Sequence, residues 1–184
     1  MRLHETIRKY HGQVLCGSED FAIAIPISHR LKKEVKDLIA RPLDQIRTLH
    51  ASVFEDVTLD EFIEILNSDN FVVVGLITHT EHLTGRIEFR DGLWNPEKVV
   101  NRLAKVRERK ILDLACCKSA DLIDNIKREV PQIVPVKATD AKLDAVAAAI
   151  YFETVVRLLS KVGYRFPYPQ VAMMAWKACQ KVVD

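Results

Sequence analysis

The sequence predicts an α/β fold in which helices cover both sides of a mostly parallel β-sheet. Continuous apolar runs, such as FAIAIPI at 21–27 and FVVVGLIT at 71–78, alternate along the chain with stretches of helical period. Strands that are buried on both faces have unbroken apolar runs, and their alternation with helices is typical of parallel sheets. The 184 residues are enough for one domain with a sizeable core. We therefore expect a three-layer α/β/α sandwich.

Turn and capping signals separate the predicted elements in the first half of the chain. Arg41-Pro42 ends the first helix, because proline disfavours helical geometry in the residue before it. Thr58 and Glu61 have the spacing of a capping box, which opens a second helix. The predicted elements are a strand at 21–27, a helix at 29–40, a strand at 46–53, a helix at 58–66 and a strand at 71–78.

The second half of the chain continues this alternation. GRIEFRDG at 85–92 predicts a small exposed strand or hairpin, and Asn95-Pro96 supply an N-cap and a first-turn proline for the next helix. The remaining elements are a helix at 95–106, a strand at 111–117, a helix capped by Ser119, a strand at 132–138, a helix from Thr139-Asp140 to about 160, and a helix at 167–183. We expect one domain at 21–184, preceded by an N-terminal extension (1–20) that is helical and packs on it.

Composition and charge argue against nucleic-acid and membrane partners. The formal net charge is only +2, so the chain lacks the basic excess that binds nucleic acid or anionic lipid. The apolar runs are far shorter than a bilayer span, and residues 1–20 lack the apolar region of a secretory signal. The four cysteines do not have the spacing of a disulfide framework or a zinc site, which favours reduced thiols and a cytoplasmic location.

Two residues suited to cysteine-peptidase chemistry follow neighbouring predicted strands. His79 comes at the end of the strand 71–78, and Cys117 ends the strand 111–117. Functional groups in sheets of this type gather outside the carboxyl ends of the strands. If the two strands pair, we expect His79 and Cys117 to be neighbours, with histidine as the base for a cysteine nucleophile.

The order and spacing of these residues resemble the CHAT branch of the caspase-like cysteine peptidases, which are related to caspases and separases. In that family an apolar strand ends in histidine, usually followed by glycine, and a later strand ends in a motif like Leu-Ser-Ala-Cys-Glu-Ser. The segment LACCKS at 114–119 is similar to that motif and matches the nucleophile to Cys117 rather than Cys116. The resemblance covers about 21–182. It implies a caspase-like sandwich and a His/Cys dyad that acts on a protein or peptide substrate.

The resemblance also implies an oxyanion hole made by the backbone amides of Thr80 and Cys117. Threonine stands here where the family usually has glycine, and it cannot adopt positive φ as freely. A catalytically weak or inactive caspase-like module that acts through protein–protein contacts is therefore the alternative. His82 is a second candidate for the base.

The surroundings of Cys117 favour a thiolate. Lys118 is its neighbour, and Ser119 caps the following helix, whose positive end also stabilises an anion. Alternatively, Cys117 is one of the small buried thiols that are common in protein cores. Charged residues near the same edge are candidates for a substrate pocket: Glu81, Asp91, Asp140 and His29. His79, Glu81 and His82 lack further ligands at a recognised spacing, so we expect no metal and no cofactor.

A flavodoxin-like or receiver-like signalling domain is another function for a chain of this pattern. The segment after the first strand, Pro26-Ile27-Ser28-His29, is not a glycine-rich phosphate loop, and the acidic cluster of a receiver is missing there. Because only about twenty residues precede the first strand, a peptidase of this kind would be controlled by a regulatory protein partner or by self-association.

Overall fold

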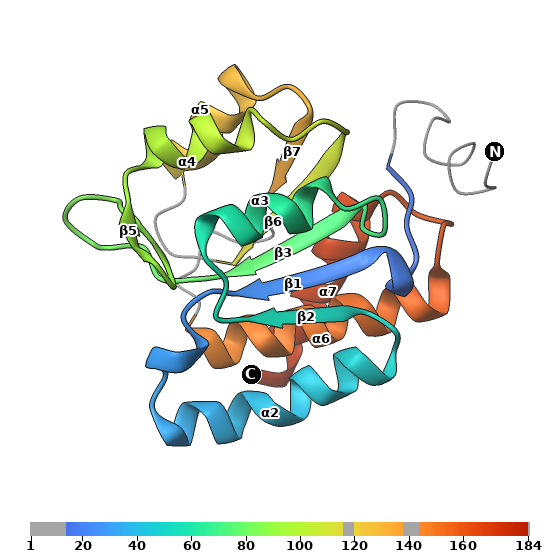
Figure 1. Cartoon of the computed structure of the whole chain (residues 1–184). Helices are drawn as coiled ribbons and strands as arrows, with labels where there is room; N and C mark the ends of the chain where they lie inside the picture. Colours follow the sequence, from blue (N-terminus) through green and yellow to red (C-terminus); the bar gives the residue numbers. More distant parts are fainter. Residues whose placement is uncertain (1–13, 116–119, 138–143, 184) are drawn as a thin grey trace.

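A computed structural model of the chain describes residues 14–115, 120–137 and 144–183. Five strands form one sheet in which every pairing is parallel. Across the sheet they run in the order β2 (Ser52–Glu55), β1 (Phe21–Ile25), β3 (Val73–Ile77), β6 (Lys110–Ala115) and β7 (Ile133–Val136). Helices lie on both sides of the sheet (Figure 1). The predicted α/β fold with a parallel central sheet is confirmed.

Two apolar cores separate the sheet from its helices. The side chains of β1 alternate between the two faces of the sheet, so this strand contributes to both cores. Phe21, Ile23 and Ile25 point to one face, and Ala22 and Ala24 point to the other. The first face is covered by α2 (Lys33–Thr48), α6 (Ala145–Val162) and α7 (Tyr168–Val183). The second is covered by α3 (Leu59–Asn67), α4 (Pro96–Leu103) and α5 (Ala120–Glu129).

A glycine in the middle of β3 lets α6 approach the sheet closely. A Cβ atom at Gly75 would lie 2.7 Å from the Phe152 ring of α6. Phe152 is fully buried and also packs against the Phe21 ring, with 5.8 Å between the ring centroids. The absence of a side chain at Gly75 therefore sets the spacing of these two layers.

The predicted end of the first helix is wrong. Helix α2 runs through Pro42 to Thr48, whereas the sequence predicts its end at Arg41-Pro42 and a strand at 46–53. The apolar stripe of the helix continues beyond the proline. Pro42 is itself buried, together with Ile39, Leu43 and Ile46. Burial of this stripe offsets the helical hydrogen bond that Pro42 cannot donate. Strand β2 consequently begins only at Ser52.

The other predicted elements are present with shifted ends. The Thr58 hydroxyl accepts a hydrogen bond from Glu61 N at 3.1 Å, and the Glu61 carboxylate accepts one from Thr58 N at 2.7 Å, so the capping box is confirmed. The predicted hairpin consists of β4 (Ile87–Phe89) and β5 (Gly92–Trp94), but the prediction that it is exposed is wrong for β4, whose three residues are buried. Helix α6 begins at Ala145, capped by Asp144, while Thr139 and Asp140 lie outside the described residues.

The described end of the N-terminal extension packs on the second half of the chain. The Val14 carbonyl accepts a hydrogen bond from Tyr168 N, and the Cys16 carbonyl accepts one from Tyr164 N, both at 3.1 Å. Cys16 is only 1% exposed, and the short 3₁₀ helix η2 (Ser18–Asp20) leads from it into β1. Backbone hydrogen bonds thus join residues 14–16 to the segment after α6 and to the first residue of α7.

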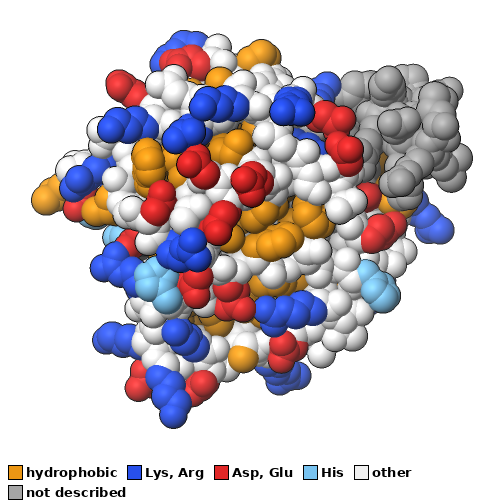
Figure 2. Space-filling model, in the orientation of Figure 1, with side chains coloured by type: hydrophobic (Ala, Val, Ile, Leu, Met, Phe, Trp, Pro, Cys, Tyr) orange, Lys and Arg blue, Asp and Glu red, His pale blue; other side chains and the backbone are white. Residues whose placement is uncertain are grey.

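The surface carries charges of both signs. Lysine and arginine side chains are mixed with aspartate and glutamate over the face shown in Figure 2. Within the described residues, every helix is too short or too polar to cross a bilayer.

Candidate functional site

The carboxyl ends of the strands meet at one edge of the sheet, where β3 and β6 are direct neighbours. Their ladder ends with the pair Ile77 and Ala115. His79 follows Ile77 by two residues, and Cys117 follows Ala115 by two residues. Cys117 lies outside the described residues, while the His79 side chain is exposed at this edge. The confirmed pairing of β3 with β6 is the condition on which the predicted dyad depends.

His79 begins a tight reversal of the chain that leads into β4. Glu88 N donates a hydrogen bond to the His79 carbonyl at 2.9 Å, and Glu81 N donates one to the Arg86 carbonyl at 2.8 Å. Thr80 and Ile87 are antiparallel bridge partners between these two bonds. In such a pair the amides of the two facing residues point away from each other. The Thr80 N–H therefore points away from β4, and it makes no backbone hydrogen bond to a described residue.

Thr80 adopts an ordinary backbone conformation. The described non-glycine residues with positive φ are His50, Asp56 and Tyr164. The turn after His79 thus does not need the conformational freedom of glycine at this position. The Thr80 side chain is only 4% exposed, and its Oγ1 atom has no hydrogen-bond partner within the described part of the chain.

Glu81 stabilises the turn that it belongs to. Its Oε2 atom accepts hydrogen bonds from Arg86 Nε at 3.0 Å, from an Arg86 terminal nitrogen at 2.9 Å and from the Thr84 hydroxyl. The hydrogen bond from Thr84 has the largest effect on the pKa of Glu81 and holds it below its ordinary value. The hydrogen bonds from Arg86 lower it further. This carboxylate is thereby engaged inside the 81–86 turn. His82 lies at the exposed tip of the same turn.

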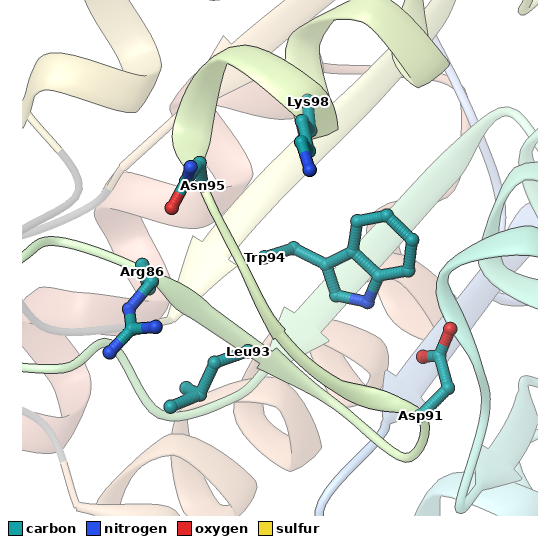
Figure 3. Close-up of a pocket in the computed structure, with 6 residues that line it drawn as sticks. All are labelled: Arg86, Asp91, Leu93, Trp94, Asn95 and Lys98. Carbon is teal, nitrogen blue, oxygen red and sulfur yellow. The ribbon is translucent and has the colours of Figure 1, made fainter.

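Asp91 lies in a shallow pocket of about 320 Å³ beside the β4–β5 hairpin (Figure 3). The indole of Trp94 occupies the middle of the close-up, with the Asp91 carboxylate near its nitrogen edge and Lys98 of α4 on the other side. Asp91 Oδ1 also accepts a hydrogen bond from Leu59 N, at the start of α3, at 3.2 Å. Two cationic side chains, Arg86 and Lys98, line this pocket together with Asp91.

His29 belongs to a different part of the edge, between the ends of β1 and β2. Its Nδ1 atom lies 2.9 Å from Asp56 Oδ1. The neighbouring Ser28 hydroxyl donates to Glu55 Oε1 at 2.7 Å. Arg30 forms an ion pair with the nearly buried carboxylate of Glu88 on β4. These three pairs join the segment after β1 to β2 and β4. Asp140, the remaining candidate for a substrate pocket, lies outside the described residues.

Among the described residues, the most deeply buried carboxylate lies elsewhere, in the middle of β6. Asp113 is fully buried, and its Oδ2 atom accepts hydrogen bonds from the hydroxyls of Tyr151 at 2.8 Å and Tyr168 at 2.5 Å. Burial raises the pKa of Asp113 to about 6, although the two hydroxyls counteract the increase. The same burial raises the pKa values of both tyrosines. These tyrosines lie 38 and 55 residues further along the chain, so no local sequence pattern identifies them as partners of Asp113.

The described residues offer no cluster of side chains that could bind a metal ion. Among the residues that the structure describes, no three histidine, cysteine, aspartate or glutamate side chains come together as a metal site. Comparison with known proteins adds no assignment. No protein-family model matches the chain, and no curated protein matches its sequence significantly.

Proposed function

We propose that the protein is a caspase-like cysteine peptidase of the CHAT type, with His79 and Cys117 as its dyad. The observation that carries the proposal is the parallel pairing of β3 with β6, in which Ile77 faces Ala115. Each of the two proposed catalytic residues stands two positions beyond this pair. The resemblance of LACCKS at 114–119 to the nucleophile motif of the family provides the second line of support.

The chemistry requires a proton to move twice. His79 takes the proton of the Cys117 thiol, and the thiolate sulfur attacks the carbonyl carbon of a peptide bond. His79 then gives the proton to the leaving amine as the C–N bond breaks. Water hydrolyses the resulting thioester and restores the thiol. The Thr80 and Cys117 amides would stabilise the oxyanion. Two observations support this role for Thr80: its N–H points away from β4, and it has no backbone hydrogen-bond partner among the described residues.

The ordinary conformation of Thr80 also bears on the alternative of a catalytically inactive module. That alternative depends on threonine standing where the family usually has glycine. Because φ at Thr80 is not positive, the substitution by itself imposes no strain on the turn. We therefore favour the active peptidase over the binding module.

The proposal is tested by alkylation of the native protein with iodoacetamide, followed by peptide mass mapping. We expect Cys117 to react fastest and Cys16, which is buried in the core, to react slowly. Because an imidazolium neighbour lowers a thiol pKa by a unit or more, His79→Ala should slow labelling of Cys117 at neutral pH by about ten-fold or more.

His82→Ala provides the matched control, because His82 is a histidine of the same turn, three residues further on. It should leave Cys117 labelling close to wild type. Equal labelling of Cys117 in wild type and His79→Ala would refute the dyad. Selective slowing by His82→Ala instead would transfer the role of base to His82. Cys117-dependent cleavage of a denatured protein substrate would separate an active peptidase from a binding module.

A further inference from the structure

The hairpin strand β5 has one open edge. Its other edge pairs with β4, and no described strand pairs with the open one. Ile87 turns its backbone groups away from Thr80 and towards its β5 partner Trp94, so the preceding β5 residue, Leu93, points its N–H and C=O out of the hairpin. Neither group meets a backbone partner outside the hairpin in the described part of the chain. Gly92 and Leu93 are exposed, so the edge is accessible.

The pocket of Figure 3 runs along this open edge. Side chains of neighbouring strand residues point to opposite faces, and Leu93 and Trp94 accordingly project to different sides of β5 (Figure 3). Both nevertheless line the same pocket. A pocket that reaches both faces of a strand lies at the edge between them. It is therefore beside the outward-pointing backbone groups of Leu93.

Three side chains of this pocket have hydrogen-bond donors without partners among the described residues. The Nε1 atom of Trp94 is buried and has none. Asn95 precedes α4, but its side chain makes no capping hydrogen bond to the helix. Lys98, in the first turn of α4, forms no ion pair within the described ranges. These groups would gain from acceptors that a ligand supplies.

The other two charged groups of the pocket are already engaged. Arg86 forms an ion pair with Glu81 at 2.9 Å, and Asp91 Oδ1 accepts a hydrogen bond from Leu59 N at 3.2 Å. The Asp91 carboxylate lies near the nitrogen edge of the indole, and Lys98 lies on the other side of the ring (Figure 3). The end of the edge beside Lys98 therefore suits an anion, while the end beside Asp91 suits a neutral acceptor.

We infer that the open edge of β5 docks an extended peptide segment of a partner protein, with an acidic residue of that segment at Lys98. The N–H and C=O of Leu93 bond the backbone of one peptide residue, as in the addition of a strand to a sheet edge. The acidic side chain accepts hydrogen bonds from Lys98 and Asn95, and Trp94 Nε1 donates to a carbonyl of the peptide. Because β4 separates this edge from the segment of His79, the inference does not depend on the peptidase proposal.

The test uses extended peptides that differ at one position. A fluorescein-labelled peptide amide, Thr-Val-Glu-Val-Thr, is compared with the same peptide carrying glutamine or lysine at its centre. Binding to the full chain with Cys117→Ala is measured by fluorescence anisotropy, so that cleavage cannot interfere. We expect the glutamate peptide to bind about three-fold more tightly than the glutamine peptide at low salt, which is the effect of one exposed ion pair, and the lysine peptide to bind most weakly. Added salt should reduce these differences.

Substitutions separate the contribution of charge from that of the backbone. Lys98→Glu should reverse the preference in favour of the lysine peptide, whereas Lys36→Glu, at an exposed lysine of α2, should leave it unchanged. Leu93→Pro removes the outward N–H without removing a hydrogen bond to β4, so it should abolish binding. Leu93→Ala keeps the N–H and should retain binding. Urea unfolding of each variant verifies that it is folded.

Methylated peptides test the same edge without a proline in the protein. Alternate peptide residues face β5, so an N-methyl group at the central residue and one at its neighbour should have unequal effects, with binding abolished by only one of them. The inference is overturned if none of the peptides binds, if the glutamate and glutamine peptides bind equally, if both methyl groups act alike, or if folded Leu93→Pro binds like wild type. Dimerisation of the protein that Leu93→Pro abolishes would assign the edge to a second copy of the chain and overturn it as well.

Discussion

The buried carboxylate of Asp113 should make the stability of the protein decrease as pH rises. Its pKa is about 6 in the folded protein, against an ordinary value of 3.8. Between these two values the folded state holds a proton that the unfolded chain has lost, so the free energy of unfolding falls with increasing pH. Each pH unit between the two pKa values lowers the free energy of unfolding by about 1.4 kcal/mol. Over the whole interval the protonated carboxyl group contributes about 3 kcal/mol of stability, and this contribution is lost by pH 7.

Asp113→Asn isolates this contribution. The asparagine carbonyl can accept both tyrosine hydrogen bonds, and its amide replaces Oδ1, which has no hydrogen-bond partner among the described residues. Urea unfolding of both proteins from pH 4 to pH 7.5 gives the difference in free energy at each pH. We expect the wild type to lose about 3 kcal/mol relative to the variant across this range. Other carboxylates titrate in both proteins and cancel.

Tyr151→Phe provides a second variant in which the same carboxylate remains titratable. It removes a hydrogen bond that lowers the pKa of Asp113, so the midpoint of the pH effect should move to higher pH. A difference between wild type and Asp113→Asn that stays constant from pH 4 to pH 7.5 would refute the reasoning. A wild type that gains stability relative to the variant as pH rises would do so as well.

Three further predictions concern stability and can be measured by urea unfolding. Gly75→Ala should destabilise the protein by about 1–3 kcal/mol, because the new Cβ would collide with the Phe152 ring, and the loss should be smaller in a Phe152→Leu background. Lys110→Met should cost about 2 kcal/mol, because the buried ammonium donates hydrogen bonds to two backbone carbonyls; a neutral result would contradict this role. Thr58→Ala should cost about 1 kcal/mol through loss of the α3 cap, and Thr58→Ser should recover most of it.

The sequence predicts those parts of the fold that local patterns encode. The strands β1 and β3 are continuous apolar runs, β6 is an apolar run interrupted by Asp113, and the Thr58 capping box is a four-residue signal. The end of α2 was predicted wrongly because a local rule for proline competed with an apolar stripe that continues through Pro42. Burial of the stripe against the sheet decides the outcome, and burial is a property of the tertiary structure.

The side-chain pairs of the edge and the core could not be predicted in the same way. His29 and Asp56 are 27 residues apart, and Asp113 is 38 residues from Tyr151 and 55 from Tyr168. No local pattern specifies which distant hydroxyl or carboxylate a buried group meets. Sequence reasoning could place His79 at the carboxyl edge of the sheet because that position follows from the end of a strand alone.

The distribution of paired and unpaired groups along the carboxyl edge helps to distinguish the candidate functions. Strands β4 and β5 form a separate hairpin, and the five strands of the main sheet follow the order 2-1-3-6-7. Counted within the sheet, this is the order of flavodoxin-like sheets, in which ligands bind where the order reverses, between β1 and β3. Here the segment after β1 is occupied by the pairs His29–Asp56, Ser28–Glu55 and Arg30–Glu88. A phosphate-bearing ligand in that crevice would have to approach three carboxylates and break these contacts.

The side of the edge beyond β3 has the opposite character. There the Thr80 hydroxyl and the Asp121 carboxylate line a pocket without partners of their own among the described residues. Most buried polar groups in folded proteins have a hydrogen-bond partner, so the Thr80 hydroxyl is a position where a bound ligand could supply one. The contrast favours a substrate that binds beside His79 over a nucleotide that binds beside His29. Binding of flavin mononucleotide that Asp56→Ala abolishes and Thr80→Val leaves unchanged would reverse this conclusion.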